Sequence, residues 1–207
     1  MLPRQINGLV STLDVKMVDR MPHERAAINF EQGYIAITKQ HPTGEITSLM
    51  HEMVHLAFCL AAGCVGAETD DREEPACTIL GRFLPRVIVD NPTMLQKMPA
   101  EVDILGETWT VLECEYPDDQ DEDVAFMDDV RNQTFRIGRN MSDDNKTLRV
   151  FMLTCASILE ACMVSGGTDA YYLPMYAMLF ALLRANPEVV ACCSEILGGE
   201  AKCANKT

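Results

Sequence analysis

The sequence predicts an α+β fold made of two similar halves in tandem, each with a small sheet and two main helices. The prediction comes from comparing the 207-residue chain with itself at an offset of 100. The strand-like segment Tyr34–Ile37 then faces Thr134–Ile137, and the helix start Thr47–Met50 faces Thr147–Val150. Strand, polar loop and apolar helix therefore follow one another twice at the same spacing, which indicates a duplication.

The repeat continues on both sides of these segments. Asn7–Leu13 resembles Leu105–Val111, and both are typical of a turn that leads into an alternating strand. Farther along, each half closes its second apolar helix with the same dipeptide, Asn91-Pro92 or Asn186-Pro187. The repeated dipeptide indicates that the two second helices end at equivalent places.

The two halves are expected to meet near Pro99, a natural linker residue. This boundary gives one predicted domain over residues 1–98 and another over residues 99–207. The polar loops Thr38–Ile46 and Gly138–Lys146 are equally long, and both are rich in turn residues. We therefore expect the main helices to start directly after them.

Apolar periodicity predicts two helices in each half. In the first half they cover Thr47–Ala62, with Gly63 as the C-cap, and about Asp71–Asp90. In the second half they cover Thr147–Val164 and Asp169–Asn186, which are apolar enough to pack against the first copy. Two helices beside a small sheet complete each predicted half.

The charge of the chain limits its partners. Seventeen basic residues against 31 acidic residues give a net charge of −14. Such a surface repels phosphate backbones and anionic membranes, so we expect neither nucleic acid nor a membrane as a partner.

The cellular compartment of the protein is predicted from the start of the chain, its apolar runs and its cysteines. The first residues contain no apolar signal segment, and the longest apolar run, Tyr171–Leu183, is too short to span a bilayer and contains Pro174. The nine cysteines are an odd number, and most fall in apolar helical patterns, so we expect reduced thiols. A cytoplasmic protein is the expectation.

The chemistry of the chain is concentrated in His51-Glu52-Met53-Val54-His55. Histidines four residues apart project from one face of a helix, close enough for both imidazoles to bind one tetrahedral metal ion. The intervening Glu52 can reach a metal-bound water. Two histidines satisfied by hydrogen bonds in the core or at its rim would be the structural alternative.

A third protein ligand must come from outside this motif. Glu73 and Glu74 lie in the first turn of the next helix, where Pro75 is tolerated. Acidic groups also favour this position because they compensate the helix dipole. Each glutamate is therefore a candidate ligand and a candidate dipole partner.

These residues resemble the zincin metallopeptidases of the gluzincin arrangement, in particular the small versions found among phage and prophage proteins. The resemblance rests on Tyr34–Ile37, Thr47–His55, Glu74 and Asp90-Asn91-Pro92. It implies that His51 and His55 bind Zn²⁺, that Glu52 is the general base and that Glu74 is the third ligand. Glu73 remains the near alternative.

The second half departs from this pattern. At the shared offset Phe151 faces His51, Met152 faces Glu52 and Cys155 faces His55, while Asp169 faces Glu74. Apolar groups and a single thiol cannot hold zinc in that way. The second half therefore resembles a degenerate zincin-like domain without a metal site.

The predicted function is that of a zinc metallopeptidase acting on a peptide or protein substrate. An extended substrate would pair with Tyr34–Ile37 at a sheet edge, as the resemblance implies for this fold. The alternative is a non-catalytic binding or structural protein on the same scaffold, because a fold does not fix a function.

Overall fold

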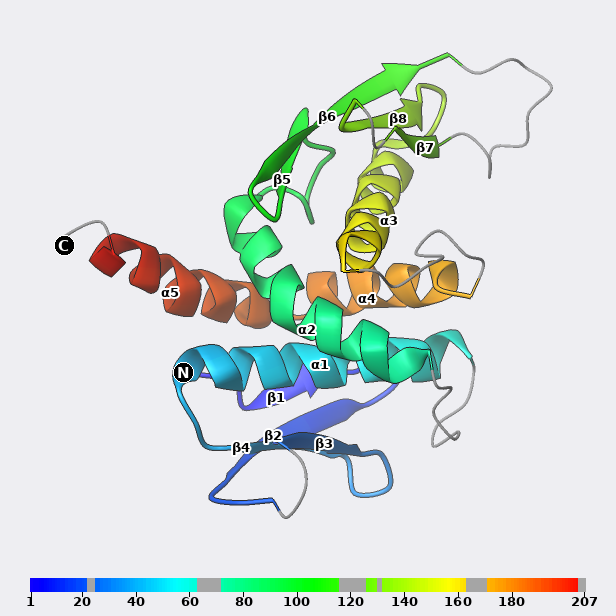
Figure 1. The fold of residues 1–207 in the computed structure, drawn as a ribbon. Helices are drawn as coiled ribbons and strands as arrows, with labels where there is room; N and C mark the ends of the chain where they lie inside the picture. Colours follow the sequence, from blue (N-terminus) through cyan, green and yellow to red (C-terminus); the bar gives the residue numbers. More distant parts are fainter. Residues whose placement is uncertain (22–24, 63–71, 116–125, 130–131, 163–170, 205–207) are drawn as a thin grey trace.

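The computed structural model describes most of the chain and confirms the α+β class (Figure 1). The described residues are 1–21, 25–62, 72–115, 126–129, 132–162 and 171–204. They form five helices and two mixed sheets of four strands each.

The first sheet contains β1 (Gln5–Asn7), β2 (Thr12–Val18), β3 (Ala26–Asn29) and β4 (Tyr34–Thr38). Its strand order is β1-β2-β4-β3, with β2 and β4 parallel and the other pairs antiparallel. The expectation that Tyr34–Ile37 lies at a sheet edge is wrong, because β4 is hydrogen-bonded to β2 on one side and β3 on the other. The edge strands of this sheet are β1 and β3.

The second sheet contains β5 (Glu101–Ile104), β6 (Glu107–Cys114), β7 (Phe126–Asp129) and β8 (Thr134–Gly138). Its order, β5-β6-β8-β7, and its pairing directions repeat those of the first sheet strand for strand. The turns before β2 and β6 differ in length, but each contains a leucine with a positive φ, Leu9 at 68° and Leu105 at 54°. The predicted repeat is therefore present in the sheets.

Two helices follow each sheet, and they begin at different residues from those predicted. Helix α1 (Pro42–Ala61) starts five residues before Thr47, because Pro42 occupies the first turn, where its missing N–H costs nothing. Helix α3 (Asp143–Ala161) starts four residues before Thr147, with Ser142 as the N-cap accepting from the Asn145 N–H. The predicted polar loops are thus partly helical.

Helices α2 (Glu73–Asp90) and α4 (Leu173–Ala185) end at the predicted Asn-Pro dipeptides. The predicted boundaries Gly63, Asp71, Val164 and Asp169 lie outside the described residues. The sequence prediction missed a fifth helix, α5 (Pro187–Ala204), which begins at the second proline itself. Proline ends the helix before it and suits the first position of a new one.

The helices form a layer between the two sheets, and the first sheet lies beside α1 while the second lies beside α3 (Figure 1). Buried side chains from both halves belong to one hydrophobic cluster, including Ile35, Met53, Phe135 and Phe151, none of which is measurably exposed. Helix α1 packs on α4 as well as on α2. The two halves therefore share a core.

The two Asn-Pro dipeptides link the halves reciprocally. The Asn91 side chain, after α2, accepts from the N–H of Asp103 and donates to its carbonyl, both at 2.8 Å. The Asn186 side chain, after α4, accepts from the N–H of Asn7 at 2.6 Å and donates to its carbonyl at 2.9 Å. Each asparagine also donates to the carbonyl four residues earlier. Each second helix is thereby fixed to the first strand of the other half.

Two further expectations concern membranes and thiols. In the described part of the chain no single helix is both long and apolar enough to cross a membrane; α4 and Pro187–Gly198 reach that threshold only as a pair bent by 84°. The described cysteines with placed side chains are free thiols, as expected: Cys59, Cys77, Cys114, Cys155, Cys162, Cys192 and Cys193.

Candidate metal centre

Helix α1 carries the motif histidines on the wall of a cleft. Because they are four residues apart, His51 and His55 project from the same side, with ring centroids 4.7 Å apart. Glu52 is 4% exposed and lines the same cleft. The cleft lies between α1, α2 and the edge strand β3, and has a volume of about 1090 Å³.

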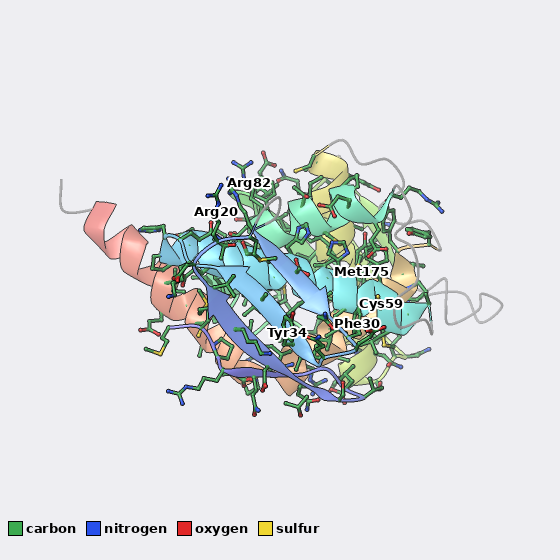
Figure 2. The ribbon with its side chains drawn as sticks, turned by 90° about the horizontal axis from the view of Figure 1, so that it is seen from below. Arg20, Phe30, Tyr34, Cys59, Arg82 and Met175 are labelled. Carbon is green, nitrogen blue, oxygen red and sulfur yellow. The ribbon has the colours of Figure 1, made fainter. Side chains whose placement is uncertain are left out.

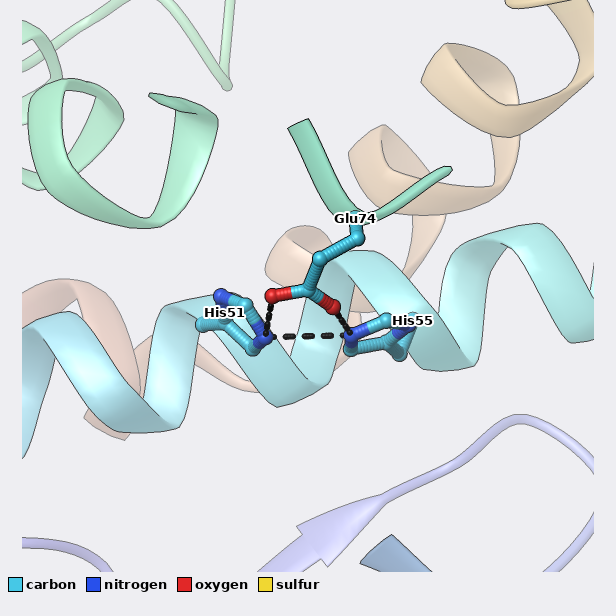
Figure 3. Close-up of side chains that lie close together, drawn as sticks. All are labelled: His51, His55 and Glu74. Carbon is cyan, nitrogen blue, oxygen red and sulfur yellow. Dashed lines mark hydrogen bonds and ion pairs between the residues drawn. The ribbon is translucent and has the colours of Figure 1, made fainter. Parts of the chain in front are cut away.

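The first turn of α2 brings Glu74 to the two histidines (Figure 3). The two Nε2 atoms of His51 and His55 lie 3.0 Å apart. One Glu74 carboxylate oxygen lies 3.2 Å from Nε2 of His55, and the other lies 3.6 Å from Nε2 of His51. Two ring nitrogens and one carboxylate, from two helices, therefore converge.

Each ring has a further hydrogen-bond partner. Nδ1 of His55 lies 2.6 Å from Oε1 of Glu73, a short contact in which the ring N–H donates to a carboxylate. His51 forms a hydrogen bond with the backbone of Cys77, which raises the pKa of the ring as donation to a carbonyl does. When the single proton of each neutral ring is on Nδ1, each Nε2 presents a lone pair to the other ring.

This arrangement favours a cation. Two imidazole lone pairs and a carboxylate that face one another repel unless a proton or a metal ion lies between them. Ligands about 2.0–2.1 Å from a tetrahedral zinc ion are separated by about 3.3 Å. The N–N separation of 3.0 Å and the two N–O separations of 3.2 and 3.6 Å, each to a different oxygen of Glu74, lie close to that value.

Protonation of His51 is a less favourable way than metal binding to relieve the repulsion between these ligand atoms. Burial is the largest influence on His51 and lowers its pKa, and the positive charge of a protonated His55 would lower it further. Glu74 and the backbone of Cys77 raise it by less. The neutral, metal-binding form of His51 is therefore favoured near neutral pH.

A second group, His55, Glu73 and Cys77, also lies close enough together to bind a metal ion. Cys77 has no exposed surface, and burial raises the pKa of its thiol far above the ordinary value. Nδ1 of His55 is also bonded to Glu73. The group that includes Glu74 borders the cleft, so it is the better candidate for a centre that a substrate can reach.

A close approach of α1 and α2 holds the centre together. Gly81 of α2 faces His51 so closely that a Cβ on Gly81 would lie 2.9 Å from the His51 Cβ and 3.0 Å from its Cα and N. Carbon atoms essentially never approach in this way, so only glycine fits. The sequence prediction did not single out Gly81, because a glycine in a helix does not by itself reveal a helix contact.

The second half contains no equivalent centre in its described residues. Phe151, Met152 and Cys155 are all buried in the core, with exposed fractions of 0%, 3% and 0%. Asp169, which faces Glu74 in the sequence comparison, lies outside the described residues. Where the structure describes the chain, both groups able to hold a metal involve only α1 and α2.

The sequence prediction gave His51, His55 and Glu74 as the ligands, with Glu73 as the near alternative for the third. The structure directs Glu74 toward both Nε2 atoms and Glu73 toward the far side of His55.

Comparisons with protein-family models, with curated proteins and with solved structures found no match.

Proposed function

We propose that this chain is a zinc-dependent peptidase whose single metal centre is formed by His51, His55 and Glu74. The observation that carries the proposal is the convergence of two Nε2 atoms and a carboxylate beside an open cleft. A His₂Glu set is a known ligand set of catalytic zinc sites, which keep a further position for water. The donor types and their spacing fit that ion.

Glu73 supports the centre without binding the metal. Its carboxylate is 10% exposed and holds the N–H of His55 at 2.6 Å. Such a partner fixes the tautomer and the orientation of a ligating ring and makes its other nitrogen more basic. The two neighbouring glutamates therefore have different roles, Glu74 as ligand and Glu73 as positioning residue.

Glu52 is the proposed general base. When bound, zinc would supply Lewis-acid chemistry, polarising a peptide carbonyl and lowering the pKa of water toward about 7. Glu52 lines the cleft next to His51 and would accept the proton of the attacking water. The same carboxyl group would then return the proton to the leaving amine, so that one residue serves both steps.

The edge strand β3 is the proposed place of substrate binding. Within the described sheet β3 pairs only with β4, and it runs along the cleft that contains the centre. An extended peptide can add to such an edge through main-chain hydrogen bonds. This proposal replaces Tyr34–Ile37 with Ala26–Asn29 as the pairing strand.

The second half is proposed to be a zincin-like copy that has kept the scaffold and lost the ligands. The repeated sheet order, the paired helices and the reciprocal asparagine links support a duplication. Its helix α4 packs against α1, on which the two histidine ligands lie. Its role would be to support the first half.

The proposal is tested with zinc-loaded full-length protein and a broad peptide library read by mass spectrometry. We expect cleavage by the wild type, loss of cleavage with retained zinc in Glu52→Gln, and loss of zinc in His51→Ala. Glu188→Gln, an exposed change on α5, is the matched control and should behave as the wild type.

Two results would contradict the proposal. If wild type and Glu52→Gln produce the same fragments, Glu52 is not the base and the cleavage has another source. If zinc binds but no peptide is cleaved, the centre belongs to a binding protein.

A further inference from the structure

The two ends of the cleft differ in chemistry. Arg25, immediately before β3, and Arg82, on α2, line one end, while Phe30 and Cys59 line the other. In Figure 2 Arg82 lies well away from Phe30 and Cys59. The cleft is therefore cationic at one end and less polar at the other.

The antiparallel packing of α1 and α2 places Arg82 on the cationic side. His55 contacts the start of α2, whereas His51 contacts Gly81, so α2 runs from the centre toward the beginning of α1. Arg82 follows Glu74 by eight residues, which is about 12 Å along the axis and about 80° around it, and both side chains line the cleft. Arg25 precedes Ala26, which pairs with the end of β4 that leads into α1.

Neither arginine is neutralised by a carboxylate among the described residues. Five other cations form ion pairs of 2.6 to 3.2 Å: Lys39 with Asp19, Arg86 with Asp90, Arg139 with Glu115, Lys146 with Glu113, and Arg184 with Asp144. Arg82 instead lies near the ring of its neighbour Phe83, at 5.3 Å. In a chain with a net charge of −14, two arginines facing one cleft end are an unusual local excess of positive charge.

We propose that this cleft selects peptides with a carboxylate on one side of the scissile bond, held by Arg25 and Arg82. The inference rests on the proposed peptidase function. Planar guanidinium groups bind carboxylates in a bidentate manner, which gives directional selectivity. An extended peptide rises about 3.3 Å per residue, so the carboxylate falls within about four residues of the cleaved bond. The group is an Asp or Glu side chain, or the carboxyl terminus.

The first test measures binding, so that it does not depend on turnover. Zinc-loaded Glu52→Gln is titrated with fluorescent peptides that are identical except for Asp or Lys at each position, with free or amidated carboxyl termini. We expect the Asp peptide to bind about tenfold more tightly at one or two adjacent positions. A loss of affinity on amidation alone would identify the carboxyl terminus as the recognised group.

The second test reverses the charges. In Glu52→Gln, the added changes Arg25→Glu and Arg82→Glu should remove the preference for Asp and favour Lys. Arg86→Glu, one turn farther on α2 and outside the cleft lining, is the matched control and should leave the preference unchanged.

The outcomes separate the two proposals. Equal affinity for the Asp and Lys peptides, or an unchanged preference after both reversals, would overturn the inference. Preference for Asp without cleavage by the wild type would support the inference and contradict the peptidase function. Cleavage of acidic and basic peptides at equal kcat/KM would support the peptidase function and contradict the inference.

Discussion

Replacing Gly81 with alanine should weaken the metal centre, because it forces α1 and α2 apart at His51. The new Cβ would lie 2.9–3.0 Å from three atoms of His51. These are the N, Cα and Cβ atoms, none of which can rotate away. To reach ordinary contact at about 3.4 Å, α2 must retreat by about 0.5 Å. Glu74, seven residues earlier on the same helix, would move with it.

Two opposing effects set the size of the change in stability. Alanine is favoured over glycine inside a helix by about 1 kcal/mol. Overpacking against a rigid neighbour costs about 1–3 kcal/mol. We therefore expect Gly81→Ala to lower the free energy of unfolding of the zinc-free protein by up to about 2 kcal/mol. Because a ligand set tolerates errors of only about 0.5 Å, zinc affinity should fall about tenfold.

Chemical denaturation in the presence of a chelator measures the free energy of unfolding of the zinc-free protein. Competition with a chromogenic chelator measures the zinc affinity. Gly198→Ala is the matched control, since no atom lies within 4 Å of its new Cβ on α5. That change should stabilise the protein by about 0.5–1 kcal/mol and leave zinc binding unchanged. The reasoning is refuted if Gly81→Ala behaves like Gly198→Ala in both assays.

Three other predictions have defined outcomes. Glu73→Gln should weaken zinc binding by about 10–100-fold in chelator competition, whereas Glu74→Gln should weaken it by more than about 100-fold; the reverse order would exchange their roles. Asn186→Ala should lower the free energy of unfolding by about 2–3 kcal/mol because it leaves the backbone of Asn7 unpaired, and a loss under about 0.5 kcal/mol would contradict the link between the halves. The folded state lowers the pKa of His51 below its unfolded value of 6.5. The zinc-free protein should therefore lose stability as pH falls below about 6.5, because the unfolded state then binds the proton more readily. An equally steep loss of stability in His51→Gln would show that another group is responsible.

The sequence was sufficient for the repeat and for the residues on α1. Helical spacing places His51 and His55 on one face whatever surrounds them, and strand-loop-helix spacing predicts β4 and β8. The choice between Glu73 and Glu74 was not accessible in this way. Adjacent helix residues point about 100° apart, and only the rotation of α2 about its axis determines which one faces the histidines.

Long-range contacts account for most of what the sequence prediction missed. The hydrogen bonds between Asn186 and Asn7 span 179 residues, so the dipeptide could be interpreted only as a helix end. Strand β3 has four half-buried residues and no apolar alternation, which left it undetected. Arg82 could have been found, because Glu74, Thr78 and Arg82 recur at four-residue spacing along α2.

The central claim is one zinc centre on α1 and α2, and metal analysis of purified protein tests it most directly. Protein prepared without chelators should contain about one zinc ion per chain. His51→Ala and His55→Ala should each reduce the content to near zero, while Cys155→Ala in the second half should not. A wild-type content near zero would contradict the account, and so would a second zinc ion bound by residues 99–207.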